Sequence, residues 1–327
     1  MRRLFFAVVL AGLAYCAYWF IGVRTVNTTA TQTVTDLRDA GWQIAYDSLR
    51  TRGFPSRFDT TVEGLVVTAP GNPVTWRVPF VQALALSYQP DRVIVVAPPA
   101  LTAESSDVTV TFANTGLRMS AQMRGDTALG LDHATAEAQT LSLATPDLVL
   151  RTGPALAAIR LAETPLAYDI YAKVSGITLP EPLWQAAFPA GALPQSLDTV
   201  ELNAVARFDV WPGAEDTPPL VTLAEVTLDD TSLRWGDLAL TLSGALAPDA
   251  AGFAAGTITV EATNWQPLID GLAAAGMIAP GIAATVQNMG QMMQAGGETL
   301  SLPLTFANGR VAMGFVPLGD APRLIAP

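Results

Sequence analysis

Hydrophobic and polar residues change their spacing along this chain, and the changes divide it into segments. Residues 4–23 form an uninterrupted run without charge. As a helix rising 1.5 Å per residue, this run is long enough to cross the ~30 Å hydrocarbon core of a bilayer. Residues 26–40 continue with apolar side chains at helical spacing, and Gly41 follows as a stop signal. From Trp42 onward a period of two dominates, which predicts β-strands.

The apolar run is longer than the ~7–15 residues typical of a cleavable signal peptide. Aromatic residues lie near its far end, as interfacial anchors do. Arg2 and Arg3 precede the run, so the positive-inside rule places the N-terminus in the cytoplasm and residues 25–327 outside it. We therefore predict an uncleaved, single-pass signal anchor in a bacterial inner membrane, with the bulk of the chain in the periplasm. The membrane-facing side chains we expect are Leu4, Phe5, Leu10, Tyr18, Trp19, Phe20 and Val23.

Two other fates of the N-terminal segment stay open. A cleaved signal peptide is one. Lipidation of Cys16 is the other, although the preceding Tyr15 is bulky where a lipoprotein box needs a small residue.

Alternating runs bounded by Gly, Pro, Asn and Asp predict many short antiparallel strands. Asp229-Asp230-Thr231 resembles a turn, and Asn308-Gly309 is a favourable two-residue hairpin turn. Residues 132–145 fit a helix or a strand. The expected strands include residues 74–78, 81–88, 92–97, 108–113, 117–123, 197–210, 238–246, 252–262, 300–306 and 311–315. Short helices are expected at residues 180–188, 265–275 and 280–295.

The predicted fold is therefore mainly β with a few short helices (α+β), built as an elongated, strongly twisted antiparallel sheet behind a transmembrane helix. The predicted organisation is an anchor at residues 1–24, a stalk helix at 25–41 and an exported β-rich domain at 42–327. Both halves of this domain, 42–190 and 191–327, contain a sheet followed by a helix. A duplicated unit is one interpretation, although the sequence has no clean period.

Composition and charge narrow the function. The net charge is −11, and the remainder after residue 24 is more acidic still, because three of the 18 basic residues precede it. We expect no nucleic-acid partner, because no basic stripe is present. The exported part has no cysteine, which excludes thiolate metal sites and cysteine nucleophiles there.

Catalytic patterns are sparse. His133 is the only histidine, and its expected role is structural, next to Asp132. The chain has no Gly-x-Ser-x-Gly elbow and no phosphate-binding glycine motif, and we expect no cofactor and no catalytic residue. Paired carboxylates are the remaining catalytic option, but Asp229-Asp230 and Glu215-Asp216 sit in turn-like segments. The tryptophans outside the anchor are expected mostly in the core, with a groove for acyl chains as the alternative. They are Trp42, Trp76, Trp184, Trp211, Trp235 and Trp265.

Two stretches resemble a known bacterial family. Gly41-Trp42 with Gly53-Phe54-Pro55, and later Gly309 with Pro317, Gly319 and Pro322, are similar to the opening and close of the uncharacterised family DUF2125. The matching residues lie near the two ends of the predicted exported domain, so the resemblance covers nearly all of it. It implies no functional residues. A weaker likeness, at Leu242-Ser243-Gly244 and residues 252–258, is to AsmA-type envelope proteins. That likeness implies a twisted sheet whose apolar face is implicated in phospholipid movement or outer-membrane assembly.

The first hypothesis is an inner-membrane-anchored periplasmic protein whose apolar sheet groove binds lipid or supports envelope biogenesis. The second is a protein-interaction or scaffold module of an envelope complex without a ligand groove. The third, a hydrolase with two carboxylates, needs a pocket with two acids ~5–10 Å apart.

Overall fold

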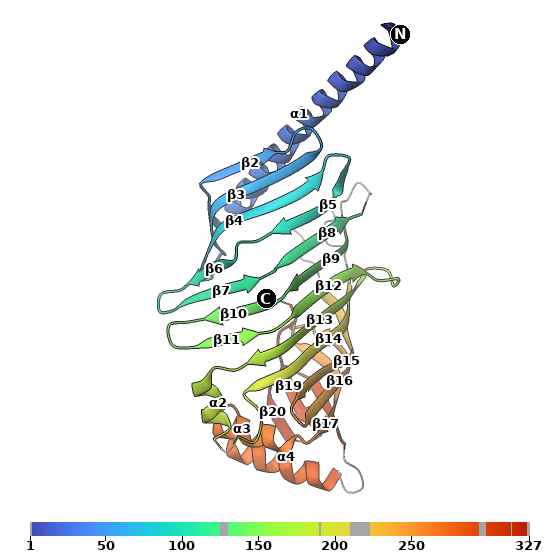
Figure 1. The fold of residues 1–327 in the computed structure, drawn as a ribbon. Helices are drawn as coiled ribbons and strands as arrows, with labels where there is room; N and C mark the ends of the chain where they lie inside the picture. Colours follow the sequence, from blue (N-terminus) through green and yellow to red (C-terminus); the bar gives the residue numbers. More distant parts are fainter. Residues whose placement is uncertain are drawn as a thin grey trace. The chain divides into compact units, whose positions relative to one another are not determined.

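The structure is a computed structural model that describes residues 2–124, 130–189, 191–209, 223–293, 299–314 and 316–325. The fold is mostly β, as predicted, with antiparallel strands and a long N-terminal helix (Figure 1). The chain groups into two compact units. Unit 1 comprises Met1–Gly125 and Ser142–Asp147, and unit 2 comprises Asp126–Leu141 and Leu148–Pro327.

Helix α1 (Arg2–Asp39) contains both the predicted anchor and the predicted stalk in one uninterrupted helix. Its length and composition are sufficient to cross a membrane. Gly41, with φ +91°, follows the last turn, and its backbone N–H donates to the Arg38 carbonyl. The C-terminal part of α1 lies against the first strands of unit 1: Asn27 Oδ1 accepts a hydrogen bond from Thr51, and Arg38 donates to the Ile44 carbonyl.

Unit 1 is built on the long β3–β4 hairpin, with β1 and β2 paired to β3, and β5 and β6 paired to β4. Strand β10 (Thr140–Ala144) crosses into unit 1 at Ser142. The other strands are β1 (Gln43–Ala45), β2 (Ser48–Arg52), β3 (Arg57–Thr68), β4 (Thr75–Leu86), β5 (Gln89–Val96), β6 (Ala100–Glu104), β7 (Thr109–Thr115) and β8 (Arg118–Met123).

The separate strands predicted at 74–78 and 81–88 form one strand, β4, so that prediction was wrong. Pro79 lies between them. On one side, β4 pairs with β6 through Thr75–Arg77 and with β5 through Gln82–Leu86. Pro79 lies where the partner changes, so its missing N–H interrupts neither of these two pairings.

Unit 2 is a meander in which β9, β12, β13 and each following strand to β20 pair in order, while β11 also pairs with β13. Residues 132–145, ambiguous in sequence, form β9 and β10. The strands are β9 (Leu131–Ala138), β11 (Val149–Thr152), β12 (Ala155–Leu161), β13 (Ala167–Thr178), β14 (Ser196–Phe208), β15 (Leu223–Trp235), β16 (Leu238–Pro248), β17 (Ala254–Thr263), β18 (Leu300–Ala307), β19 (Arg310–Met313) and β20 (Val316–Asp320).

Asp229 and Asp230 are not at a turn, which corrects the prediction from sequence. They lie within β15 at a bulge, where the register with β16 shifts between Leu228 and Thr231. Asp230 has φ +51°. The extra residue keeps Leu228 and Leu233 on the same face of the sheet although they are five positions apart. The other candidate acidic pair, at 215–216, lies outside the described residues.

In the β16–β17 pair, each strand contains one glycine that lies against the backbone of the other strand. Gly244 and Gly256 have φ +138° and +142°, and a Cβ at either would collide with a carbonyl oxygen of the opposite strand. These positions therefore allow the two strands to approach more closely than other residues would permit.

The predicted β18–β19 hairpin is confirmed. Asn308 and Gly309 have φ +52° and +72°, as a type I′ turn requires. Phe315, at the end of the predicted second strand, lies outside the described residues.

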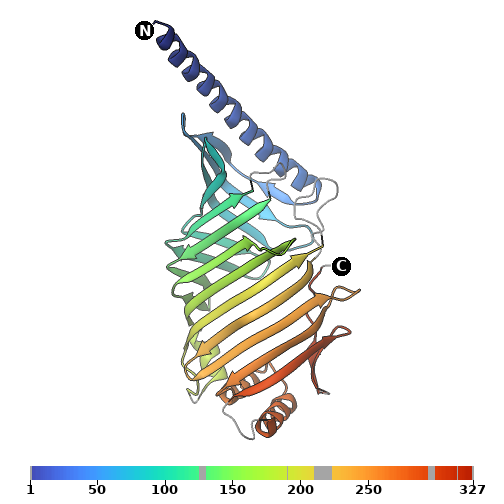
Figure 2. The same ribbon diagram turned by 90° about the vertical axis from the view of Figure 1, so that its right-hand side faces the viewer.

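The three predicted short helices are present in unit 2, at one end of its strands (Figure 2). They are α2 (Glu181–Ala187), α3 (Gln266–Ala274) and α4 (Pro280–Met293). A buried cluster lies beneath them. Its members are Phe188, Leu193, Leu197, Trp235, Leu238, Ala262, Trp265, Leu300, Leu302 and Met313.

Candidate functional site

The strands of unit 2 place apolar and polar side chains on opposite faces. Ala172 of β13 lies opposite Leu202 of β14, and the next pair, Lys173 and Glu201, belongs to the other face. The same division continues through β18 by the register of each pair. We call the first surface the apolar face. It carries Ile170, Ala172, Leu202, Val226, Leu228, Leu242, Leu246, Val260, Leu304 and Phe306.

The cover over the apolar face decreases along β18. Leu300 is 1% exposed and Leu302 is 8% exposed, whereas Leu304 and Phe306, two and four residues further on, are only half-buried. The buried end packs in the cluster under the helices, to which Val286 of α4 contributes. The helices therefore cover this end more completely than the rest of the strand.

Strand β16 shows how open the middle of the sheet is. Leu238 is buried at its start, but residues 239–248 are all half-buried, whichever face they occupy. Leu242, on the apolar face, is thus half-buried, and so is Thr241 on the polar face. A strand with one covered face would instead alternate between buried and exposed positions, as the first residues of β18 do.

Unit 1 contains an open hollow of about 550 Å³ at the point where β4 exchanges β5 for β6. Val66, Val78 and Leu101 contribute apolar walls, and Asp47 and Arg77 contribute charge. Arg77 Nε donates to Glu104 Oε2 over 2.7 Å, so its charge is already paired. The hollow is a mixed surface with room for a small ligand or solvent.

The polar face of unit 2 carries a cluster around the only lysine. Lys173 Nζ lies 3.0 Å from Glu201 Oε2, and the Tyr171 hydroxyl donates to Glu201 Oε1 over 3.0 Å. The hydrogen bonds from Lys173 and then Tyr171 hold the pKa of Glu201 below its ordinary value. The bond to Glu201 raises the pKa of Lys173, and desolvation followed by the same carboxylate raises the pKa of Tyr171. The cluster is a solvent-facing cross-strand network.

His133 Nδ1 lies 2.8 Å from Asp132 Oδ2, the neighbour expected from sequence, and both side chains are exposed. Among the described residues, no group of three or more His, Cys, Asp or Glu side chains is arranged to hold a metal ion.

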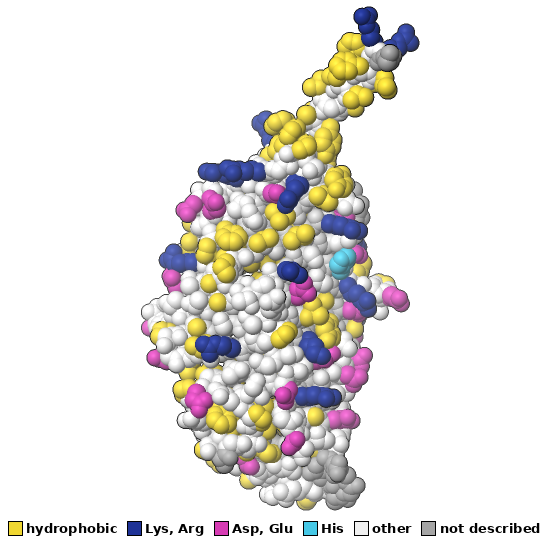
Figure 3. Space-filling model, viewed as in Figure 1, with side chains coloured by type: hydrophobic (Ala, Val, Ile, Leu, Met, Phe, Trp, Pro, Cys, Tyr) yellow, Lys and Arg dark blue, Asp and Glu magenta, His cyan; other side chains and the backbone are white. Residues whose placement is uncertain are grey.

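The predicted membrane-facing residues divide into two groups. Leu4, Phe5, Leu10, Tyr18 and Phe20 are exposed on α1, and Val23 is half-buried. In Figure 3, hydrophobic side chains cover α1, with basic side chains at its N-terminal tip. Trp19 differs, because only 6% of it is exposed.

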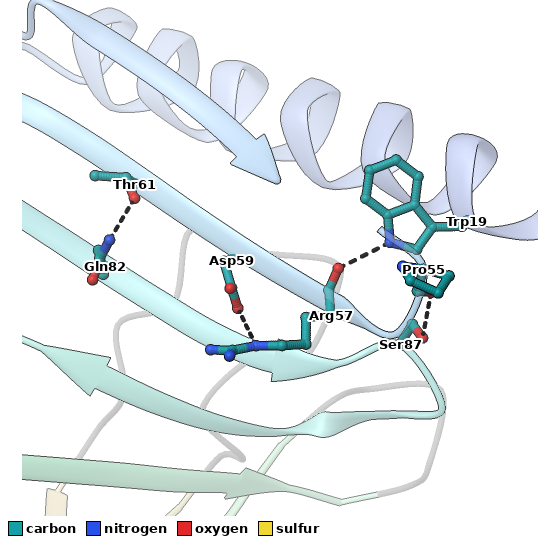
Figure 4. A network of polar contacts seen from close by, with 7 residues as sticks. All are labelled: Trp19, Pro55, Arg57, Asp59, Thr61, Gln82 and Ser87. Atoms are coloured by element: carbon teal, nitrogen blue, oxygen red, sulfur yellow. Dashed lines mark hydrogen bonds and ion pairs between the residues drawn. The ribbon is translucent and has the colours of Figure 1, made fainter. Parts of the chain in front are cut away.

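Trp19 is buried against the sheet of unit 1. Its indole Nε1 donates to the Arg57 carbonyl over 2.9 Å (Figure 4), and its ring stacks on Phe58 and meets Phe54 edge-on. Ser87, which is fully buried, lies 2.9 Å from the Tyr15 hydroxyl through its Oγ. We call this arrangement the helix–sheet corner. Sequence reasoning missed it, because the pattern of residues 81–88 predicts one strand, and nothing in that pattern indicates a contact between Ser87 and α1.

The residues behind the family resemblance occupy turns and edges. Gly53, Phe54 and Pro55 form the turn between β2 and β3 in the helix–sheet corner, while Gly41 ends α1 before half-buried Trp42. In unit 2, Gly309 is in the β18–β19 turn, Pro317 and Gly319 are on β20, and the Pro322 carbonyl accepts the Ala254 N–H over 2.9 Å.

The tryptophans outside the anchor take different positions. Trp235 and Trp265 are buried in the cluster of unit 2, and Trp184 packs against it. Trp76 of unit 1 is 39% exposed and lies against Phe112, with 5.4 Å between ring centroids. Trp211 lies outside the described residues.

Comparison with known proteins places the chain in a family but gives no activity. The family model described as "Uncharacterized protein conserved in bacteria (DUF2125)" matches residues 19–322. Neither the curated proteins nor the solved structures contain a match.

Proposed function

This chain belongs to the bacterial DUF2125 family, and on that premise we propose that it binds lipid acyl chains along the apolar face of unit 2 while α1 anchors it in the inner membrane. In this proposal the exported units lie in the periplasm, and the protein is a lipid-binding component of envelope biogenesis rather than an enzyme.

The observation that carries the proposal is the half-exposed stretch of the apolar face beyond the helices. Exposed apolar surface costs free energy that an apolar ligand would relieve. Each methylene group that leaves water contributes ~0.8 kcal/mol, so a chain segment of several methylenes offsets the cost of ordering it. Leu202, Leu242 and Val260 present aliphatic side chains of the kind that pack against an acyl chain.

The polar face of unit 2 also supports the proposal that the ligand is an acyl chain. It carries Lys173, Glu201 and other polar side chains that stay hydrated, so one side of the sheet suits water and the other suits hydrocarbon. This division favours a ligand that is largely apolar over a small polar metabolite. A headgroup would extend beyond the apolar face into solvent.

The orientation follows from the N-terminus. Arg2 and Arg3 flank the start of α1, and basic residues favour the cytoplasmic side of the bilayer. Both units follow α1 in the chain and would then lie on the periplasmic side. A protein so placed has access to lipids of the membrane that holds it.

The experiment is lipid analysis of the intact protein, purified from membranes in a mild detergent. Native mass spectrometry would detect bound lipid, and extraction would identify it. We expect phospholipid or fatty acid to be retained with defined stoichiometry after extensive delipidating washes, whereas a single-helix membrane protein of similar anchor length, purified in parallel, retains none. Recovery of a lipid-free protein with a stoichiometric protein partner would contradict the proposal and favour the scaffold hypothesis.

A further inference from the structure

Only a short apolar part of helix α1 precedes its first hydrogen bond to the strands of unit 1 and their turns. Tyr15 is its first residue with a hydrogen bond to the sheet, at Ser87, so residues 4–14 form the apolar part that precedes this contact. Eleven residues of helix rise ~16 Å. A transmembrane helix needs about 20 residues to cross a ~30 Å hydrocarbon core. The rest of the apolar run, through Val23, is therefore beside the helix–sheet corner.

This geometry leaves two arrangements. Either the bilayer thins around a short apolar helix, or the corner itself enters the membrane surface with α1. The second arrangement is supported by the turns at the corner, which expose apolar rings. Phe54, between β2 and β3, is 53% exposed, and Tyr88, between β4 and β5, is 64% exposed. Phe20 of α1 is 64% exposed and stacks on Phe54, so the exposed surface is continuous with the anchor.

The polar groups of the corner are suited to such a position, because hydrogen-bonding groups near hydrocarbon need internal partners. The Ser87 N–H donates to the Ser56 carbonyl over 2.9 Å, and the Ser87 carbonyl accepts the Tyr18 hydroxyl. The Arg57 N–H donates to the Gly53 carbonyl over 2.9 Å, and the Arg57 carbonyl accepts the Trp19 indole.

We infer that the tips of these two turns, at Phe54 and Tyr88, insert into the headgroup region of the periplasmic leaflet beside α1. Unit 1 would thus be seated on the membrane surface instead of standing away from it on a stalk. Aromatic rings favour this depth, and two exposed arginines, Arg52 and Arg57, lie next to the β2–β3 turn, although Arg57 Nε also pairs with Asp59 Oδ1 at 3.1 Å. The inference rests on the part of the proposed function in which α1 spans the membrane.

The test uses the full-length protein with Cys16→Ala, reconstituted in phosphatidylcholine–phosphatidylglycerol vesicles. Single cysteines at Phe54, Tyr88, Leu10 or Ser106 would carry an environment-sensitive fluorophore. Leu10 reports the position of the anchor. Ser106 is exposed and lies in the turn between β6 and β7. This turn is near the start of β4, at the opposite end of that strand from Tyr88. Quenching by nitroxides on lipid headgroups, nitroxides on acyl chains and aqueous iodide would locate each label. Phe54→Cys removes a ring that contacts Trp19 and could weaken folding. Tyr88→Cys leaves the contacts of Trp19 with Phe54 and Phe58 in place, so position 88 decides the result in that case.

The inference predicts a blue shift and headgroup-nitroxide quenching at positions 54 and 88, acyl-chain quenching at 10, and iodide quenching alone at 106. If positions 54 and 88 are as accessible to iodide as 106 while 10 lies in the acyl chains, the inference is wrong and the anchor stands. If position 10 is also in water, both the inference and the membrane-spanning role of α1 are wrong.

Discussion

Trp19 and Phe58 stack with ring centroids 6.2 Å apart, and this contact joins the apolar N-terminal helix to the sheet of unit 1. Both side chains are 6% exposed. The residue that the sequence offers as an interfacial anchor is therefore part of a protein core. A helix fixed in this way transmits its orientation to the sheet.

The close packing behind this contact gives a first prediction. A Cβ at Gly22 would lie 2.5 Å from Phe58 Cζ, whereas a Cβ at Gly12 would meet nothing within 4 Å. Gly22→Ala should destabilise unit 1 by ~1–3 kcal/mol, because a buried ring must shift. Gly12→Ala should be neutral or slightly stabilising. Urea unfolding in detergent, followed by tryptophan fluorescence, would measure both, and equal midpoints for the two variants would argue against the docked helix.

The helices of unit 2 provide a second matched pair. A Cβ at Gly271 of α3 would overlap the Phe188 ring, while Gly281 of α4 has open space around it. We expect Gly271→Ala to cost ~1–3 kcal/mol and Gly281→Ala to cost nothing. Hydrogen exchange of β18 amides should show the loss, since Leu300 and Phe188 belong to the same buried cluster. Unchanged exchange in Gly271→Ala would show that α3 does not cover this end of the sheet as described.

The cluster on the polar face predicts a pH dependence. Glu201 has a pKa lowered from 4.5, so its contribution is present above pH 4.5 and is lost as pH falls through the folded value. Lys173 has a pKa raised from 10.5, so its contribution is present below pH 10.5 and is lost as pH rises through the folded value. The melting temperature of wild type should therefore exceed that of Glu201→Gln most clearly between these limits.

The difference between these two proteins should shrink in acid, where the wild-type carboxylate becomes protonated and resembles the amide. A difference that is constant from pH 7 down to pH 2.5 would mean that the charged network adds nothing. Because the cluster is solvent-exposed, high salt should also reduce the difference.

Filling the apolar face should reduce ligand binding. Ala172→Trp adds an indole to the apolar face, and Ala245→Trp adds the same group to the opposite face, opposite Thr257. We expect Ala172→Trp to lower the lipid retained per protein several-fold and Ala245→Trp to leave it near wild type, at equal far-UV circular dichroism. Mass spectrometry of the purified proteins would measure the ratio. Equal retention in both variants would place any bound lipid elsewhere.

Some of this architecture follows from local pattern. The alternation from 197 to 210 predicts β14 because side chains on a strand point alternately to two faces, and the Asn308-Gly309 pair predicts its hairpin because both residues accept positive φ. The apolar length of residues 4–23 predicts a helix of membrane-spanning length. These signals lie within a few neighbouring residues.

Other features depend on partners that are distant in sequence. An apolar Trp19 fits lipid or protein equally well, and only Phe58, 39 residues later, identifies its environment. Asp229 and Asp230 look like a turn because a bulge uses the same residue types, and only the register with β16 distinguishes the two. Alternation likewise marks Leu242 as facing one side of the sheet without showing how much of that side the helices cover.

Neighbouring positions on β16 allow the most direct measurement. A photoreactive benzoyl-phenylalanine at Leu242 or at Thr241 would probe the apolar and polar faces of one strand in intact bacteria, with radiolabelled phospholipid. The proposed lipid-binding role predicts a labelled lipid adduct from position 242 and none from position 241. Equal labelling from the two positions, or no adduct from 242 in a folded, membrane-inserted protein, would contradict it.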